Sequence, residues 1–148
     1  TARSNLMWAG AMAENRIIKL GKRTDFQCRQ MARQLEVYAD CDHGGGLAVL
    51  QPVYYRHIYK DGLGKFKRFA VEIWGISPEG KTDEEIACAG INALKDFIRE
   101  MGLPATLEEL GVDESTDLKA IADSCVIVSG GYRRLTHGEI FEIFRECL

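Results

Sequence analysis

Residues 24–52 read TDFQCRQMARQLEVYADCDHGGGLAVLQP. The pattern predicts a helix, a tight acidic turn that carries one histidine beside three glycines, and a second helix. Glycines allow close packing of helices, so His43 is expected at the start of the second helix. This arrangement would hold an imidazole rigidly at the mouth of a cleft. One histidine alone is a poor metal site, so its companions decide what the segment can do.

Size and charge place the chain among globular proteins. Its 148 residues are the size of one domain with a real core. The 19 basic and 22 acidic residues give a net charge of −3 without a basic stripe, which argues against nucleic acid as a partner. No stretch approaches the roughly 20 apolar residues of a membrane helix, so no membrane span is expected.

The cysteines point to a reducing compartment. Their number is odd and their positions are scattered, which argues against a disulfide framework and against a cysteine zinc site. We therefore expect a cytoplasmic protein. The chain begins at Thr1, without a signal peptide, and enters helical sequence almost at once, so we expect it to be a piece of a longer protein. The cysteines are Cys28, Cys41, Cys88, Cys125 and Cys147.

Helix-start signals and apolar spacing predict an all-α fold. A threonine followed three residues later by Glu or Gln forms a capping box, and four occur, at Thr24, Thr82, Thr106 and Thr136. Apolar residues recur at helical spacing in 63–75, 82–101, 107–110, 117–128 and 137–147. The β-branched run Val126–Val128 makes the end of the fourth of these helices uncertain. We predict one domain over residues 1–148, an irregular bundle of seven or eight helices.

The helix expected over Asp25–Ala39 has two stripes. The apolar stripe, expected in the core, contains Cys28, Met31, Ala32, Leu35 and Tyr38. The charged stripe carries Asp25, Arg29, Arg33 and Glu36. Its simplest interpretation is a solvated face with Asp25–Arg29 and Arg33–Glu36 ion pairs, each worth a few tenths of a kcal/mol.

Other suggestive residues have ordinary explanations. Gly44–Gly46 lack the preceding strand and the Lys-Ser/Thr of a phosphate loop. His57 is expected to be a partly exposed packing residue, and His137 to be solvated. The aromatic residues at 54–74 have helical spacing, which favours core packing over a stacking platform.

Three segments resemble one known family. They are ARSNLMWAGAMA at 2–13, YADCDHGGGLAVLQP at 38–52 and, more loosely, GLPATLEELG at 102–111 with LTHGEIFEIF at 135–144. Together they resemble the C-terminal half of the iron-containing alcohol dehydrogenases, especially the butanol dehydrogenase-like branch. The resemblance covers essentially the whole chain. It implies a helical domain like that of dehydroquinate synthase.

The resemblance implies a two-domain NAD(P)-dependent oxidoreductase that acts on alcohols or aldehydes. The missing N-terminal nucleotide-binding domain would be the partner, with iron or zinc in the cleft between the halves. In the family an upstream aspartate and histidine bind the metal together with two histidines of this part. His43 matches the second of these two. The first falls on Arg29, and a further family histidine, four residues later, falls on Arg33.

These departures put the metal in doubt. A guanidinium is always protonated and has no lone pair to donate, so Arg29 cannot replace an imidazole ligand. His43 is then the single retained metal ligand position, and we expect the isolated chain to hold no catalytic metal, to bind no dinucleotide and to show no turnover.

Two other functions remain open. A metal-free relative could use Arg29 and Arg33 to bind a carboxylate or phosphate, or could serve assembly. A helical interaction protein without enzymatic ancestry is the third reading. Because a chain cut from its partner domain exposes apolar surface, we also expect self-association into a homo-oligomer.

Overall fold

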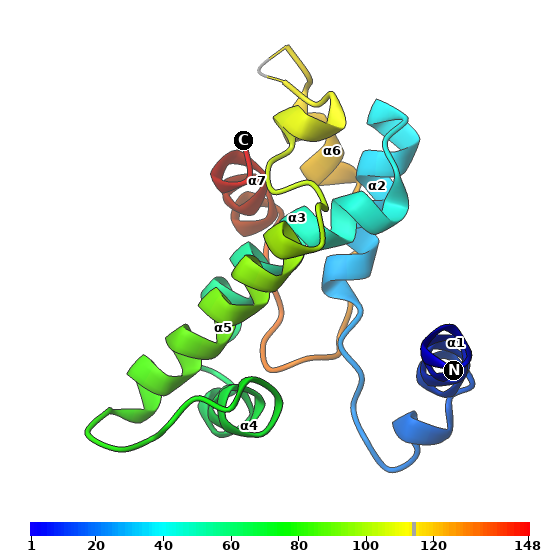
Figure 1. Ribbon diagram of the computed structural model, residues 1–148. Coiled ribbons are helices and arrows are strands. Elements are labelled where there is room, and N and C mark those ends of the chain that lie inside the picture. The colour runs from blue at the N-terminus through cyan, green and yellow to red at the C-terminus, as the bar shows by residue number, and fades with distance from the viewer. Residues whose placement is uncertain (114) are drawn as a thin grey trace.

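The computed structural model describes residues 1–113 and 115–148, and the regular elements assigned in these residues are all helices (Figure 1). This confirms the predicted all-α bundle. The α-helices are α1 (Ala2–Glu14), α2 (Gln27–Ala39), α3 (His43–Ile58), α4 (Leu63–Trp74), α5 (Asp83–Glu100), α6 (Leu118–Ser124) and α7 (His137–Glu146). Two short 3-10 turns are η1 (Ile17–Lys19) and η2 (Glu108–Leu110).

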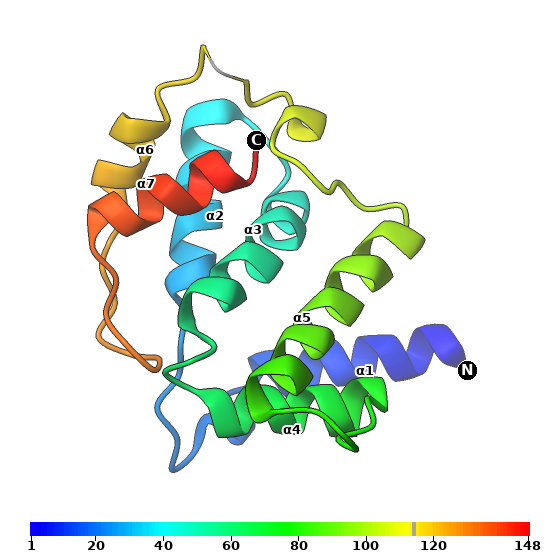
Figure 2. The same cartoon turned by 90° about the vertical axis from the view of Figure 1, so that its left-hand side faces the viewer.

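Helix α3 lies at the centre of the bundle. It packs against α2, α5 and α7, while α4 lies against α5 and α6 against α7 (Figure 2). Eight residues of α3 are buried, among them Leu50, Tyr54 and Ile58, so this helix is apolar around most of its circumference. The buried Pro52 sits inside the helix, where it leaves one backbone hydrogen bond unmade.

The cap predictions succeed where the helix start is determined locally. Complete capping boxes form at Thr82 with Glu85 and at Thr136 with Glu139. At Thr24 the prediction was wrong: α2 begins at Gln27, and its first turn is not capped by a threonine. The Asp25 carboxylate instead accepts a hydrogen bond from the Gln27 amide at 3.0 Å.

The end of α6 shows why the Val126–Val128 run is not helical. The helix stops at Ser124, and the buried side chain of Gln27 bonds the segment that follows. Gln27 Nε2 donates to the Val126 carbonyl at 3.2 Å, and its Oε1 accepts from the Val128 amide at 3.0 Å. The Gln27 side chain thus makes hydrogen bonds to this segment like those that a neighbouring β-strand would make. β-Branched residues favour the extended backbone that such bonding requires.

Several residues of the predicted apolar stripes lie at the surface, and Tyr38 in 25–39 and Ile73 in 63–75 are two examples. Tyr38 is 55% exposed and Ile73 is 66% exposed. Met31, Ala32 and Leu35 of the same α2 stripe are buried, as predicted. Both of these residues lie close to the end of their helices, α2 and α4.

Helix α1 stands apart from the bundle. It contains no buried residue and packs mainly on η1, and Figures 1 and 2 together show it beside the other helices rather than among them. In the part of the chain that the structure describes, no helix is both long enough and apolar enough to cross a bilayer. All five cysteines are free thiols.

Candidate functional site

His43 is the first residue of α3, as predicted. The Asp42 carboxylate caps the helix by accepting from the Gly45 amide at 2.6 Å. Gly45 and Gly46 are buried, and a Cβ on Gly45 would come within 2.8 Å of Leu110, so the glycines do allow close packing here. The imidazole therefore projects from a firmly held helix start.

The nearest carboxylate to His43 belongs to Glu36 of α2. His43 Nδ1 lies 3.1 Å from Glu36 Oε2 and is shielded from water, but the approach does not have the geometry of a hydrogen bond. The contact becomes a charge pair when the imidazole is protonated. It replaces the predicted Arg33–Glu36 pair, which was wrong.

Arg29 and Arg33 project from one face of α2 into an open cavity of about 470 Å³. Helix α1, η1 and the loop after α6 complete its wall. The lining residues are Glu14, Arg16, Lys19, Phe26, Arg29, Gln30, Arg33 and Val128. Four of them are cationic and one is anionic, so the cavity is strongly positive.

The predicted Asp25–Arg29 pair was also wrong, because Asp25 has other partners. Its Oδ2 accepts a 2.6 Å hydrogen bond from the buried hydroxyl of Tyr54. Burial and this bond raise the pKa of Tyr54 well above its usual value. Arg29 instead lies 3.6 Å from Glu14 at the end of α1, a loose and largely exposed contact.

The ring of Phe26 organises the cavity wall. Lys19 Nζ lies 4.5 Å from the ring centroid, and the Arg29 guanidinium lies 5.8 Å from it. Cation–π attraction of this kind is worth about 0.5–1 kcal/mol at exposed sites. Phe26 therefore holds two cations of the cavity near each other although their charges repel.

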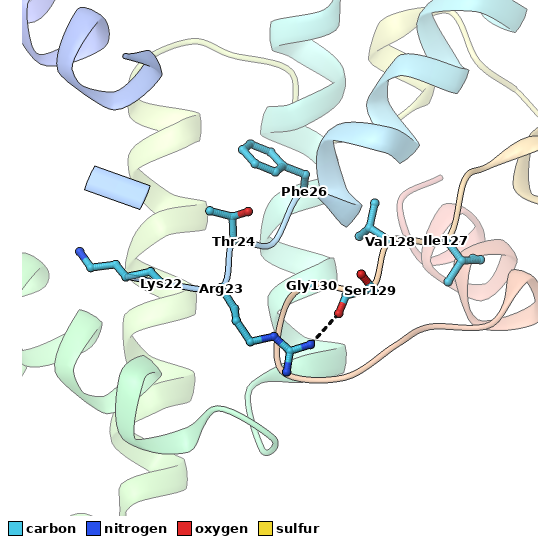
Figure 3. Close-up of a pocket in the computed structure, with 8 residues that line it drawn as sticks. All are labelled: Lys22, Arg23, Thr24, Phe26, Ile127, Val128, Ser129 and Gly130. Atoms are coloured by element: carbon cyan, nitrogen blue, oxygen red, sulfur yellow. Dashed lines mark hydrogen bonds between the residues drawn. The ribbon is translucent and has the colours of Figure 1, made fainter. Parts of the chain in front are cut away.

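A second cavity of about 590 Å³ adjoins the first and shares Phe26 and Val128 with it. Figure 3 shows the side chain of Arg23 reaching across it, where Nη2 donates to the Ser129 carbonyl at 2.9 Å. The two walls meet closely, since a Cβ on Gly130 would lie 1.8 Å from the Thr24 carbonyl oxygen. Only glycine fits there.

These residues do not fit an iron or zinc site. Arginine offers no electron pair, and His43 does not line the cavity that holds Arg29 and Arg33. Across residues 1–113 and 115–148, no three His, Cys, Asp or Glu side chains are grouped to hold a metal ion. Whether the isolated chain takes up metal stays a prediction.

The remaining histidines have structural partners. His57 is half-buried with Nε2 3.0 Å from Glu146 Oε1. His137 is exposed, as predicted, although its Nε2 also lies 3.0 Å from the Cys125 carbonyl oxygen.

The interpretation of the sequence missed most of the cavity wall. Glu14, Arg16, Lys19 and Phe26 were not singled out, although the segment RIIKLGKR at 16–23 holds four cations in eight residues. That local density was the available signal. The segment contributes to the cavity wall only because it folds back beside α2, and the spacing of residues alone did not show this.

Comparisons with known proteins agree on one family. Residues 1–148 match a family model described as "Fe-containing alcohol dehydrogenase family, C-terminal". NADH-dependent butanol dehydrogenase A of Clostridium acetobutylicum is 35% identical over 98% of this chain and 38% of its own length. Probable NADH-dependent butanol dehydrogenase 1 of Bacillus subtilis is 29% identical over 99% of this chain.

The fold agrees with a solved structure. The crystal structure of NADH-dependent butanol dehydrogenase A from Thermotoga maritima superposes with a TM-score of 0.87 at 28% identity. The match covers 99% of this chain and 39% of that one. The chain thus spans less than two fifths of the length of these relatives.

Proposed function

The chain belongs to the Fe-containing alcohol dehydrogenase family, and we propose that it is the C-terminal helical part of a longer NAD(P)-dependent oxidoreductase acting on alcohols or aldehydes. The family match over the whole chain carries this proposal. The butanol dehydrogenases that it resembles supply the substrate class. The other part of the longer protein would be a nucleotide-binding domain, and the five free cysteines support a cytoplasmic location.

In this proposal the chain contributes half of a cleft and no complete catalytic centre. His43 is the one residue of this chain at a family metal position that can donate an electron pair, because Arg29 occupies the other such position. Arg33 occupies the position of a further family histidine that does not bind the metal. When bound, the family metal would polarise a substrate oxygen as a Lewis acid. The residues of this chain do not fit that ion, so we assign no catalytic step to them.

The test compares the longer protein, expressed with the coding sequence upstream of Thr1, with the chain 1–148. We expect the longer protein to oxidise NADH or NADPH with butanal, and the chain alone to show no activity. Absence of turnover by the longer protein with either cofactor would contradict the proposal. Elemental analysis of the same samples reports the iron and zinc that each one retains.

A second candidate function is a metal-free relative that binds an anion. The positive cavity around Arg29 and Arg33 favours it, because two cations stand where the resemblance places imidazoles. If these two changes alone removed the metal, the Arg29→His and Arg33→His double variant of the longer protein should recover iron or zinc. No gain of metal in that variant would show that other ligands are missing as well.

A further inference from the structure

The cavity between α1 and α2 gathers more positive charge than its surroundings neutralise. It is lined by Arg16, Lys19, Arg29 and Arg33, and among the described residues Glu14 is its one carboxylate. Among the residues that the structure describes, neither Arg16 nor Arg33 takes part in an ion pair. The Arg29–Glu14 contact is 3.6 Å long, whereas a charge-assisted hydrogen bond measures about 2.7–2.9 Å.

This arrangement costs the fold free energy, and the contacts of Lys19 and Arg29 with the Phe26 ring offset only part of the repulsion. Like charges four residues apart on a helix, as Arg29 and Arg33 are, destabilise it by a few tenths of a kcal/mol. Arg16 adds to the cost, because its φ of 70° places a side chain in the left-handed region. An anion bound among these groups would remove the repulsion.

We propose that this cavity binds the phosphate group of a small phosphorylated molecule, with Arg29 and Arg33 as its principal ligands. The excess of three positive charges suits a phosphate dianion better than a single carboxylate. Guanidinium groups donate paired hydrogen bonds to phosphate oxygens. The volume of about 470 Å³ lies within the range of small-molecule sites.

The inference deepens the second candidate function and rests on it for its biological meaning. Its test can nevertheless fail separately. Phosphate binding is measured on the chain 1–148 alone, whereas that candidate is rejected if the longer protein retains iron or zinc and turns over butanal.

The experiment titrates the chain with pyrophosphate, inorganic phosphate and acetate at pH 7 and low salt, by calorimetry and by NMR of the backbone amides. We expect saturable binding in the order pyrophosphate, phosphate, acetate, with amide shifts confined to α2 and η1 and an affinity that falls as NaCl is added. Absence of saturable binding, or equal binding of acetate and pyrophosphate, would overturn the proposal.

Matched variants separate the site from the overall charge. Arg29→Gln and Arg33→Gln should each weaken pyrophosphate binding at least tenfold. Arg68→Gln on α4 and Arg145→Gln on α7 remove the same charge from exposed i, i+4 and i, i+3 ion pairs and should leave the affinity within twofold. Equal weakening in all four variants would mean a nonspecific charge effect and would contradict the assignment. Arg33 is exposed, so Arg33→Gln should leave the fold intact.

Discussion

At the scale of the residue, the hydrogen bond from Tyr54 to Asp25 connects the central helix to the start of α2. Tyr54 is 2% exposed and the bond is 2.6 Å long. In Tyr54→Phe the carboxylate loses a buried donor, so we expect the free energy of unfolding to fall by about 1–2 kcal/mol. Urea unfolding at pH 7 measures this. Tyr38→Phe, at an exposed position, should change stability by less than about 0.5 kcal/mol, and equal effects would contradict the role of the bond.

Buried thiols give the protein a sensitivity to alkaline pH. Burial raises the pKa of Cys125 and of Cys147 to about 12, from an ordinary value of 9.0. Between pH 9 and 12 the folded state keeps these protons while the unfolded state loses them. The stability that the two buried thiols contribute is therefore fully present only below pH 9. Stability should fall between pH 9 and 12, by at most about 1.4 kcal/mol per pH unit for each thiol.

Thermal unfolding across this pH range tests whether stability falls as the pH rises. The Cys125→Ala and Cys147→Ala double variant should lose less stability between pH 9 and 11 than the parent, once the difference at pH 7 is subtracted. Parallel curves would show that other groups cause the alkaline loss.

At the scale of the element, α4 and α5 approach closely at one glycine. A Cβ on Gly90 would lie 2.5 Å from the Ala70 Cβ and 2.8 Å from its Cα, in backbone that cannot move aside easily. We expect Gly90→Ala to destabilise the fold by about 1–3 kcal/mol through overpacking. Gly64→Ala, in α4 with nothing within 4 Å, should instead stabilise by up to about 1 kcal/mol. Paired denaturant curves measure both, and a stabilised Gly90→Ala would refute the close contact.

Helices were predictable because their signals are local. The boxes at Thr82 and Thr136 lie within four residues of sequence, and both form. The box at Thr24 fails because Gln27, its expected partner, is drawn to Val126 and Val128, about 100 residues away. Local side-chain chemistry thus determines where these two helices begin, and hydrogen bonds to residues distant in the sequence explain the box that fails.

The candidate site was only half predictable for the same reason. The guanidinium chemistry of Arg29 and Arg33, and the place of His43 at a helix start, followed from residue type and spacing. The charged partners of these residues did not follow from the sequence, because Glu36 contacts His43 and Arg29 contacts Glu14. Several carboxylates lie within reach of each cation in the sequence, and only the folded chain selects among them.

At the scale of the whole molecule, α1 is the part that the bundle leaves uncovered. Three successive large apolar side chains, Leu6, Met7 and Trp8, are 67–75% exposed, and the helix has no buried residue. Apolar surface of this extent favours association, and fully burying one such side chain contributes about 1.5–3 kcal/mol. We therefore expect the chain 1–148 to associate through α1 as its concentration rises.

Light scattering across a concentration series measures this association. The parent should exceed its monomer mass of 16.6 kDa at high concentration, and a variant with Leu6→Gln, Met7→Gln and Trp8→Gln should remain at it. Glutamine keeps helix propensity, so the variant removes apolar surface without melting α1. Val37→Gln and Ile73→Gln, 74% and 66% exposed in the parent, remove similar surface elsewhere and should leave association unchanged. A monomeric parent at every concentration would mean that α1 needs no partner, and loss of association in the control variant would move the contact from α1 to the bundle.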